Sequence, residues 1–311
     1  MQTKQTQLVS IIVPAKNEEE NIPLLYEAVS KSLVNHSWEL IVIDDGSTDH
    51  TFEKLKEIAK KDSRVRGIQF QKNFKKSAAY MAGFAAAKGE IIITMDADLQ
   101  DDPRELPKFI QEIKNNDLVV GWKYKRQDPA TKVIASRIFN KVNKVLFGLH
   151  IHDFDCGYRA MRSHVVKDLA LYGDLYRYIP ALVARSGYRV GEIQVHHQPR
   201  KFGKSKYGAG RLITGALDLL TVKFIVDYNQ RPLHLFGGAG LLSFGVGFLA
   251  ELYVVYCRLI IGDLFVVHLP ALIFGVLMMI MGVQLFGIGL IGELVSSISR
   301  TQRYRVKETV N

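Results

Sequence analysis

Acidic side chains gather directly after a short apolar run of this 311-residue chain. Residues 94–103 read TMDADLQDDP and follow three isoleucines at 91–93. Aspartates this close repel one another and are costly to desolvate, so a buried cluster requires a cation beside it. Asp96 and Asp98 flank one alanine, and in an extended chain both side chains project the same way. The pair therefore predicts a site for one hard divalent cation, Mg²⁺ or Mn²⁺, although a solvated acidic turn can carry the same short pattern.

Two further polar clusters follow apolar runs in the same way. Residues 44–49 read DDGSTD, and residues 14–18 read PAKNE. The first of these combines a tight turn with helix-capping residues, so it fits a strand-to-helix loop. A carboxylate of Asp44 or Asp45 at such a tip can also accept an N–H of a nucleobase, and the two interpretations are compatible.

The elements that must position these clusters alternate along the chain. β-Branched runs are followed by helical patterns, which predicts an α/β fold with a parallel sheet covered on both faces. The predicted strands lie near residues 9–14, 40–43, 65–70 and 90–95. Ligands of such sheets bind beyond the carboxyl ends of the strands. Because all three polar clusters follow strands, we expect them to share that edge of the sheet.

The composition changes after about residue 232. The charged residues between 233 and 295 are Glu251, Arg258, Asp263 and Glu293. Leu235–Cys257 is otherwise apolar and would span about 34 Å as a helix, more than the roughly 30 Å hydrocarbon core of a bilayer. Leu264–Ile291 is longer and carries no charge. The two segments predict a transmembrane helical hairpin, in which the role of Glu251 stays open.

Basic residues predict the orientation of this hairpin. Lys223 and Arg231 precede it, four more basic residues follow it, and only Arg258 lies in the connector. By the positive-inside rule the bulk of the protein is then cytoplasmic, at a bacterial inner membrane or its equivalent. Cys156 and Cys257 lie far apart along the chain and by themselves suggest neither a disulfide nor a zinc site.

Several motifs occur in a fixed order over residues 8 to about 240. They are IIVPAKNEE, IVIDDGSTD, MDADLQDDP, HDFDCGYRAMR, RYIPAL, PRKFGKSKYG and RPLHLFG. Together they resemble the family 2 glycosyltransferases, whose nucleotide-sugar-binding domain has the Rossmann-like fold called GT-A. Within this family the chain is most similar to the polyprenyl-phosphate glycosyltransferases, the branch that contains the dolichol-phosphate mannose and glucose synthases.

The resemblance implies a reaction and a set of residues. The reaction is the inverting, metal-dependent transfer of a sugar from a UDP- or GDP-sugar to a membrane polyprenyl phosphate. The residues that would bind the nucleotide are Pro14, Lys16, Glu18, Asp44, Asp45 and Asp96. Those that would surround Mg²⁺ or Mn²⁺ are Asp96, Asp98 and Gln100, and Arg200 would reach the phosphates.

Two positions depart from the family pattern. Lys16 stands where relatives often have an aromatic residue, and Lys75 stands where they often have glycine. These differences leave the base specificity open and do not alter the expected chemistry.

Basic stretches are expected to meet the lipid acceptor. Residues 131–148 carry apolar side chains at helical spacing beside a basic stripe that includes Arg137. A basic amphipathic helix fits a membrane surface, although an ordinary surface helix has the same pattern. The candidate ligands of the acceptor phosphate are Arg137, Arg200, Lys204, Ser205 and Lys206.

A phosphate acceptor changes what catalysis requires. A phosphate monoester has a second pKa of about 6 and is already anionic at neutral pH, so a strong general base is unnecessary. Asp153 and Asp155 are the candidates for a base or an acceptor-orienting group, because they lie in the motif HDFDCGYRAMR. Alternatively, they pair with Arg159 or Arg162 and have a structural role.

The predicted organisation has four parts. They are a cytoplasmic GT-A domain (1–208), a juxtamembrane amphipathic helix (209–232), two transmembrane helices (233–295) and a basic cytoplasmic tail (296–311). The expected partners are a nucleotide-sugar, a polyprenyl phosphate and the lipid bilayer, and no nucleic acid. Glycines in the predicted spans allow close helix packing and, through it, a homo-oligomer.

Two alternatives share some of these features. A processive polysaccharide synthase has similar N-terminal motifs, but it carries a Gln-x-x-Arg-Trp element and more spans, whereas Gln230-Arg231 is followed by proline here. A non-catalytic membrane scaffold with a nucleotide-binding domain would be expected to lose an acidic metal residue, and Asp96 and Asp98 are both present. We therefore expect an enzyme.

Overall fold

The computed structural model describes residues 7–124, 130–198, 219, 221–224, 228 and 231–298. The chain divides into two compact units, Met1–Val222 and Lys223–Asn311. Four of the predicted phosphate ligands, Arg200, Lys204, Ser205 and Lys206, lie outside the described residues. The same holds for most of the predicted juxtamembrane helix and nearly all of the predicted basic tail.

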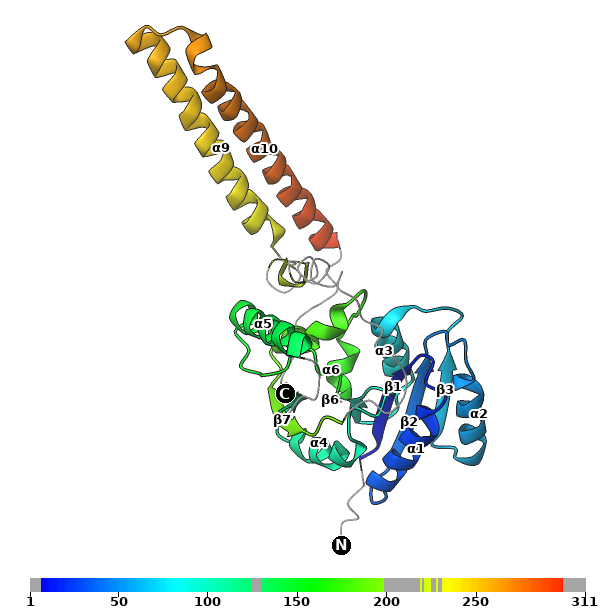
Figure 1. Ribbon diagram of the computed structural model, residues 1–311. Coiled ribbons are helices and arrows are strands. Elements are labelled where there is room, and N and C mark those ends of the chain that lie inside the picture. The colour runs from blue at the N-terminus through cyan, green and yellow to red at the C-terminus, as the bar shows by residue number, and fades with distance from the viewer. Residues whose placement is uncertain are drawn as a thin grey trace, which may run out of the picture. The chain divides into compact units, whose positions relative to one another are not determined.

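The N-terminal unit is built on a seven-stranded sheet (Figure 1). Its strands are β1 (Val9–Ala15), β2 (Trp38–Asp44), β3 (Val65–Gln69), β4 (Ile91–Thr94), β5 (Leu118–Lys123), β6 (Arg159–Arg162) and β7 (Val190–Val195). The order across the sheet is β3-β2-β1-β4-β6-β5-β7. The first four strands are mutually parallel, as the alternating pattern predicts. The α/β fold class is thus confirmed.

One strand runs against the others. β6 pairs antiparallel with both β4 and β5, whereas β7 pairs parallel with β5. The prediction of an all-parallel sheet was therefore incomplete. The reason is that β6 is only four residues long, reads RAMR and contains no apolar run, so its sequence gives no strand signal.

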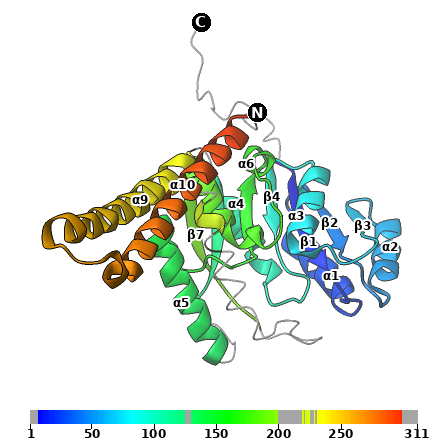
Figure 2. The same ribbon diagram turned by 90° about the horizontal axis from the view of Figure 1, so that it is seen from above.

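Helices pack against the sheet. They are α1 (Asn21–Ser32), α2 (Thr51–Lys61), α3 (Lys75–Ala86), α4 (Leu106–Glu112), α5 (Ala130–Phe147), α6 (Ser163–Lys167) and α7 (Ile179–Arg185), with short 3₁₀ turns at Pro103–Glu105 and Leu175–Tyr178. Both views place α2 beside β3 at the end of the sheet (Figures 1 and 2). A Cβ at Gly83 of α3 would collide with Ile12 and Ile43, so glycine lets this helix lie close on β1 and β2.

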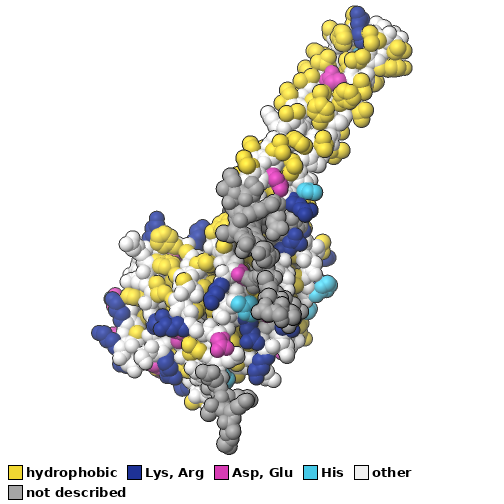
Figure 3. All heavy atoms as spheres, turned by 180° about the vertical axis from the view of Figure 1, so that it is seen from behind, with side chains coloured by type: hydrophobic (Ala, Val, Ile, Leu, Met, Phe, Trp, Pro, Cys, Tyr) yellow, Lys and Arg dark blue, Asp and Glu magenta, His cyan; other side chains and the backbone are white. Residues whose placement is uncertain are grey.

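The C-terminal unit is a helical hairpin. It consists of α9 (Pro232–Tyr256), a π-helical turn (Cys257–Ile261), a 3₁₀ turn (Phe265–His268) and α10 (Leu269–Ile298). Two stretches, Pro232–Ile261 and Phe265–Ser296, are long and apolar enough to cross a membrane. Large apolar side chains cover the outside of both helices (Figure 3). The length and composition therefore agree with the predicted two-helix hairpin.

Glycines allow the two long helices to pack closely against each other. A Cβ at Gly240 would lie 2.7 Å from the carbonyl oxygen of Gly282, and one at Gly247 would lie 2.5 Å from that of Gly275. Side chains at these positions would force the backbones apart. Close approach of small residues is a common means of packing helices in a membrane, where no hydrophobic driving force acts between them.

Candidate active site

The carboxyl ends of three neighbouring strands define the candidate site. β1 lies between β2 and β4, with Ala15 paired to Asp44 and Ile12 paired to Thr94. The loops that follow these strands therefore begin at the same edge of the sheet. As predicted from the sequence, the three polar clusters share this edge.

Hydrogen bonds tie the loops after β1 and β2 to each other. Asn17 Nδ2 donates to Thr48 Oγ1 at 3.2 Å, and the Thr48 N–H donates back to Asn17 Oδ1 at 2.9 Å. The Asn17 N–H also donates to Ser47 Oγ at 2.9 Å. These hydrogen bonds thus join the two loops into one wall of the site.

Backbone strain concentrates at the same edge. Among the described residues, the non-glycine residues with a positive φ are Asn17 (52°), Lys75 (70°) and Leu99 (59°). They follow β1, β3 and β4, respectively. Such conformations cost about 1–3 kcal/mol each and persist mainly where the surrounding structure enforces them, as at ligand sites. The left-handed conformation of Lys75 also explains in physical terms why glycine suits this position.

The two aspartates that end β2 are held by internal hydrogen bonds. Asp44 accepts from the Ser47 N–H at 2.9 Å and from Gln69 Nε2 at 3.0 Å. Asp45 accepts from the backbone N–H groups of Phe74 and Lys75 at 2.6 and 3.1 Å. Burial raises the pKa of Asp45, and these hydrogen bonds oppose the rise. Each carboxylate oxygen can accept a second hydrogen bond, so contact with a nucleotide stays a prediction.

The other predicted nucleotide residues stand on or after β1. Pro14 is half-buried in the strand, and Lys16 is half-buried just beyond it. Burial is the largest effect on the pKa of Asp45 and raises it, whereas the positive charge of Lys16 lowers it. Lys16 therefore lies near that carboxylate. Glu18 accepts from Asn21 Nδ2 at 2.6 Å and fixes the start of α1.

A lysine contacts the first aspartate of the DAD sequence. Lys76 Nζ, in the first turn of α3, donates to Asp96 Oδ1 at 2.5 Å. The ammonium group also lies 5.7 and 5.4 Å from the ring centroids of Tyr80 and Tyr176. Burial would raise the pKa of Asp96, but the charges of Lys76 and Lys123 outweigh it, and the pKa is lowered. Asp96 is therefore held ionised.

A second lysine lies deeper in the same cluster. Lys123, the last residue of β5, places Nζ 2.9 Å from Oδ1 of the fully buried Asp101. Asp101 in turn accepts the backbone N–H of Asp96 at 3.2 Å. Burial lowers the pKa of Lys123, but the neighbouring carboxylates raise it more, and the net pKa is well above its usual range. This buried pair positions the backbone of the acidic loop.

Sequence reasoning missed both lysines. It required a cation beside the acidic cluster and assigned that role to a metal, whereas Lys76 and Lys123 supply two positive charges there. A signal existed, because Lys123 ends an apolar strand and Lys76 lies in the first turn of the helix that follows β3. A metal remains compatible with the site, since Asp98, Gln100 and the one-third-exposed Asp96 offer hard oxygen donors.

The fixed turn after β4 places those donors. Asp98 is 7% exposed, and its Oδ1 accepts the Gln100 N–H at 3.2 Å. The left-handed Leu99 between them makes this turn tight. Asp98 is therefore oriented by the backbone rather than free to rotate.

The two aspartates of the HDFDCGYRAMR motif differ in exposure. Asp153 is 2% exposed, whereas the Asp155 side chain is 32% exposed and its Oδ1 lies 3.9 Å from Arg177 Nε. The expected alternative partner Arg159 is fully buried and donates instead to the carbonyl oxygens of Tyr176 and Phe154, at 2.7 and 3.0 Å. One ion-pair partner of Asp155 is thus Arg177, which sequence reasoning did not single out.

The acceptor candidates are only partly described. Arg137 is exposed on α5, whose bounds agree with the helix predicted at 131–148. Arg200, Lys204, Ser205 and Lys206 fall in the undescribed stretch, so their binding of phosphate stays a prediction.

Comparison with known proteins identifies the family. Residues 10–170 match the family described as Glycosyl transferase family 2. The chain is 36% identical over 296 residues to dodecaprenyl-phosphate galacturonate synthase of Rhizobium johnstonii, covering 93% of this chain and 87% of the relative. It is 33% identical over 309 residues to undecaprenyl-phosphate 4-deoxy-4-formamido-L-arabinose transferase of Aeromonas hydrophila, covering 98% and 93%, respectively.

Solved structures share the fold of the N-terminal unit. Glucosyl-3-phosphoglycerate synthase of Mycobacterium tuberculosis, in complex with phosphoglyceric acid, superposes with a TM-score of 0.56 at 18% identity, over 71% of this chain and 80% of that one. The same enzyme with Mn²⁺, UDP-glucose and phosphoglyceric acid gives a TM-score of 0.56 at 19% identity, over 70% and 79%. These likenesses confirm the predicted GT-A fold. The chain is thus a glycosyltransferase that belongs to family 2 and to its polyprenyl-phosphate branch.

Proposed function

We propose that the protein transfers a sugar from a nucleotide-sugar to a polyprenyl phosphate, with inversion, and so makes a polyprenyl-phosphate-linked monosaccharide. The names of the relatives support the class of acceptor, since both are polyprenyl-phosphate enzymes similar over nearly the whole chain. The observation that carries the proposal is the Asp96–Lys76 ion pair, with Asp98 fixed in the next turn, at the carboxyl edge of the sheet.

The donor would bind at this edge of the sheet. Asp44 and Asp45 end β2, and Lys16 follows β1, so a nucleotide laid across the edge would meet all three. Asp96, Asp98 and Gln100 would hold a divalent cation, which is supported by the Mn²⁺ and UDP in the structurally similar enzyme. When bound, such a cation would act as a Lewis acid that stabilises the charge of the departing nucleotide diphosphate.

Lys76 would also stabilise the negative charge of the departing nucleotide diphosphate. Its ammonium group is held by Asp96 and by two aromatic rings, so its position is fixed before substrate binds. A preorganised positive charge near a diphosphate stabilises the leaving group without a reorganisation cost at the moment of reaction. Lys76 therefore complements Asp96 and Asp98 in the proposed reaction.

The acceptor would need orientation more than activation. A phosphate monoester is anionic at neutral pH, so an oxygen of the lipid phosphate can attack the anomeric carbon directly. Asp155 is exposed by a third, whereas Asp153 is almost fully buried. We therefore assign an acceptor-orienting role to Asp155 with Arg177, and a structural role to Asp153.

The hairpin would anchor the enzyme where its acceptor lies. Two stretches of transmembrane length follow the catalytic unit, and their outer surface is apolar. The basic residues that flank the hairpin favour a cytoplasmic catalytic unit. Nucleotide-sugar donors would then reach the site from the cytoplasm.

A direct assay tests the proposal. The purified full chain in detergent is incubated with undecaprenyl phosphate, Mn²⁺ and a panel of UDP- and GDP-sugars that includes UDP-galacturonate and UDP-4-deoxy-4-formamido-L-arabinose. Mass spectrometry should detect a lipid-linked monosaccharide for one donor. Absence of product with every donor, from a protein shown to be folded, would contradict the proposal.

Two variants test the assigned residues. Asp98→Asn keeps an oxygen that can accept the Gln100 N–H but removes the charge, so turnover should fall at least about 100-fold, with thermal unfolding unchanged. Glu57→Gln, on the exposed face of α2, is the matched control and should leave turnover unchanged. Full activity of the Asp98 variant would overturn the metal assignment.

A further inference from the structure

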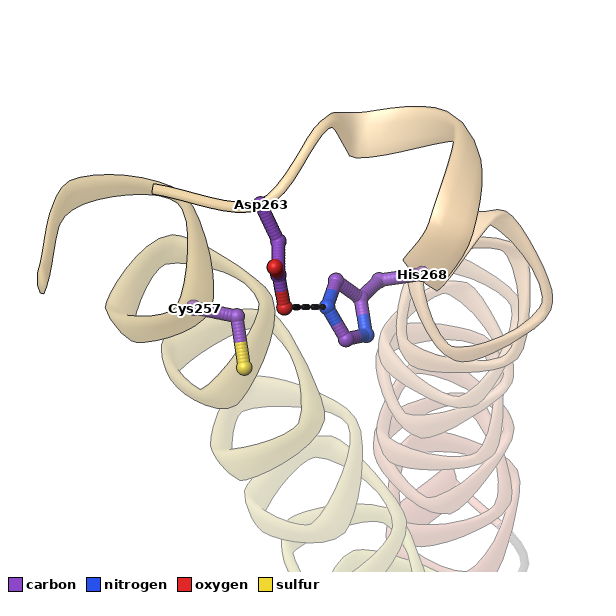
Figure 4. A group of neighbouring side chains, drawn as sticks. All are labelled: Cys257, Asp263 and His268. Atoms are coloured by element: carbon purple, nitrogen blue, oxygen red, sulfur yellow. Dashed lines mark hydrogen bonds and ion pairs between the residues drawn. The ribbon is translucent and has the colours of Figure 1, made fainter. Parts of the chain in front are cut away.

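Three potential metal ligands of different chemistry meet at the turn between α9 and α10 (Figure 4). They are Cys257, Asp263 and His268, whose ligand atoms all lie within 4.8 Å of one another. His268 Nε2 is 3.0 Å from Asp263 Oδ2. We propose that these residues bind a divalent transition metal, Zn²⁺, and that the metal joins the end of one long helix to the start of the other.

The backbone is shaped to bring the three residues together. The Cys257 carbonyl oxygen accepts the N–H groups of both Gly262 and Asp263, at 3.0 and 3.2 Å. Gly262 has a φ of 88°, a conformation that glycine adopts without strain. The helix ends in a π-helical turn, Cys257–Ile261, and such turns are often found at functional sites. The chain thereby folds Asp263 back over Cys257.

The exposure of the three side chains increases from Cys257 through His268 to Asp263. Cys257 is 1% exposed, the His268 side chain is 16% exposed and that of Asp263 is 42% exposed. The thiol and imidazole thus line the inner side, and the carboxylate stands at the opening. An ion would therefore enter past Asp263. The ring of Tyr253 packs against His268 with centroids 5.7 Å apart and limits its rotation.

The donor set selects the class of metal. One sulfur, one imidazole nitrogen and one carboxylate oxygen suit Zn²⁺ and related transition ions, whereas Mg²⁺ prefers oxygen donors alone. Tetrahedral Zn²⁺ with bonds of about 2.0–2.3 Å places neighbouring ligand atoms roughly 3.3–3.7 Å apart. The imidazole nitrogen and carboxylate oxygen, at 3.0 Å, need only a slight separation. The sulfur can adjust by rotation about the Cα–Cβ bond.

Charge balance favours the bound ion at this place. Binding through Nε2 releases the thiol proton of Cys257, and any proton on His268 Nε2, to solvent and leaves the imidazole proton on Nδ1, so Zn²⁺ then faces a thiolate, a carboxylate and a neutral imidazole. The ion and its three ligands are then neutral in sum, and the charge near them is that of Arg258, whose guanidinium donates to the Asp263 carbonyl oxygen at 3.3 Å. Without a metal, the Asp263–His268 ion pair and a hydrogen bond between Tyr253 and Cys257 would hold the same three side chains, and the cobalt titration distinguishes the two cases.

Cobalt spectroscopy tests the site without reference to transferase turnover. The full chain, prepared in detergent without a polyhistidine tag and stripped with a chelator, is titrated with Co²⁺. We expect about one tightly bound Co²⁺ per chain, with visible d–d bands of tetrahedral geometry and a near-ultraviolet thiolate-to-cobalt charge-transfer band. Zn²⁺ should displace the Co²⁺ and abolish both signals.

Variants locate the ligands. Cys257→Ser should lose the charge-transfer band, and His268→Ala should weaken binding at least about tenfold. Cys156→Ser and His234→Ala are the matched controls and should retain both the band and the affinity. Circular dichroism checks that each variant keeps its helices, and Asp263→Asn replaces any variant that does not.

Three results would overturn the proposal. The first is the absence of a charge-transfer band in the unaltered chain at excess Co²⁺. The second is a band that survives Cys257→Ser and disappears in Cys156→Ser. The third is equal affinity of the unaltered chain and the His268 and Asp263 variants. Because the readout is metal binding in the hairpin, failure here leaves the proposed transferase reaction untouched.

Discussion

Replacing Lys76 by methionine tests the electrostatic design of the active site most directly. The substitution keeps an unbranched side chain one atom shorter than lysine but removes the charge that lies 2.5 Å from Asp96 Oδ1. Removing one partner of a fully buried ion pair lowers the free energy of unfolding by about 3–5 kcal/mol. The two side chains are 20% and 33% exposed, so solvent screening should reduce this to about 1–2 kcal/mol.

The same change should alter the pH dependence of turnover. Burial raises the pKa of Asp96 and the Lys76 charge is the largest effect that lowers it, so removing the charge raises the pKa. The ionised carboxylate is the form that the proposed reaction needs. The acid limb of the rate profile should therefore move to higher pH. If the attraction between Lys76 and the departing diphosphate is of similar size, about 1–2 kcal/mol, its loss from the transition state predicts a rate reduction of roughly 5- to 30-fold above that limb.

The assay is the initial rate of glycolipid formation as a function of pH. Lys76→Arg retains a cation and should restore the acid limb, at least in part, which a purely structural role would not explain. Lys60→Met, on the exposed side of α2, removes a lysine far from any aspartate of the site and serves as the control. If Lys76→Met and Lys60→Met share the profile of the unaltered enzyme, the reasoning about Asp96 is wrong.

Three further substitutions test the fold by thermal or denaturant unfolding of the full chain in detergent. Lys75 has a φ of 70°, so Lys75→Gly should relieve backbone strain and raise the free energy of unfolding by about 0.5 kcal/mol. Lys72 has no positive φ, so Lys72→Gly should lower the free energy of unfolding by a similar amount. An equal loss of stability in both variants would show that Lys75 is not strained. Gly247→Ala places a Cβ 2.5 Å from the facing helix backbone and should cost about 1–3 kcal/mol, whereas Gly245→Ala meets nothing within 4 Å and should be neutral or stabilising. The pKa of Asp62 is lowered to about 2, chiefly by hydrogen bonds from Arg64, so its stabilisation exists above the unfolded pKa near 4 and fades as pH falls toward about 2. With solvent screening taken into account, Asp62→Asn should lower the free energy of unfolding by about 1 kcal/mol at neutral pH and should not change it near pH 2. A difference in stability between the two proteins that persists in acid would contradict this pH dependence.

The sequence predicts the central part of the fold because its strands are buried on both faces. Every residue of β2 is buried, so the run reads as apolar and β-branched up to the polar loop that follows. The site follows from the same pattern, since parallel strands place their carboxyl ends at one edge. The helical hairpin is equally evident, because a segment of membrane length must lack charge.

The elements that the sequence did not reveal are short or depend on distant partners. β6 has four residues and two of them are arginines, so it is a strand only because β4 and β5 supply its hydrogen bonds. Arg177 contacts Asp155 from a 3₁₀ turn more than twenty residues along the chain. Likewise, Asp263 and His268 become candidate ligands of a metal only when the turn folds them onto Cys257.

The acidic cluster shows why a correct physical requirement can have more than one answer. Four aspartates within ten residues demand a cation, and the sequence offers a metal as the simplest one. The fold also brings Lys76 from twenty residues before Asp96, and Lys123 from β5, which β6 separates from β4. These lysines keep the loop ionised and in place before any ligand binds. A divalent ion and a donor diphosphate would then enter a site whose carboxylates are already charged, which lowers the cost of assembling the reactive complex.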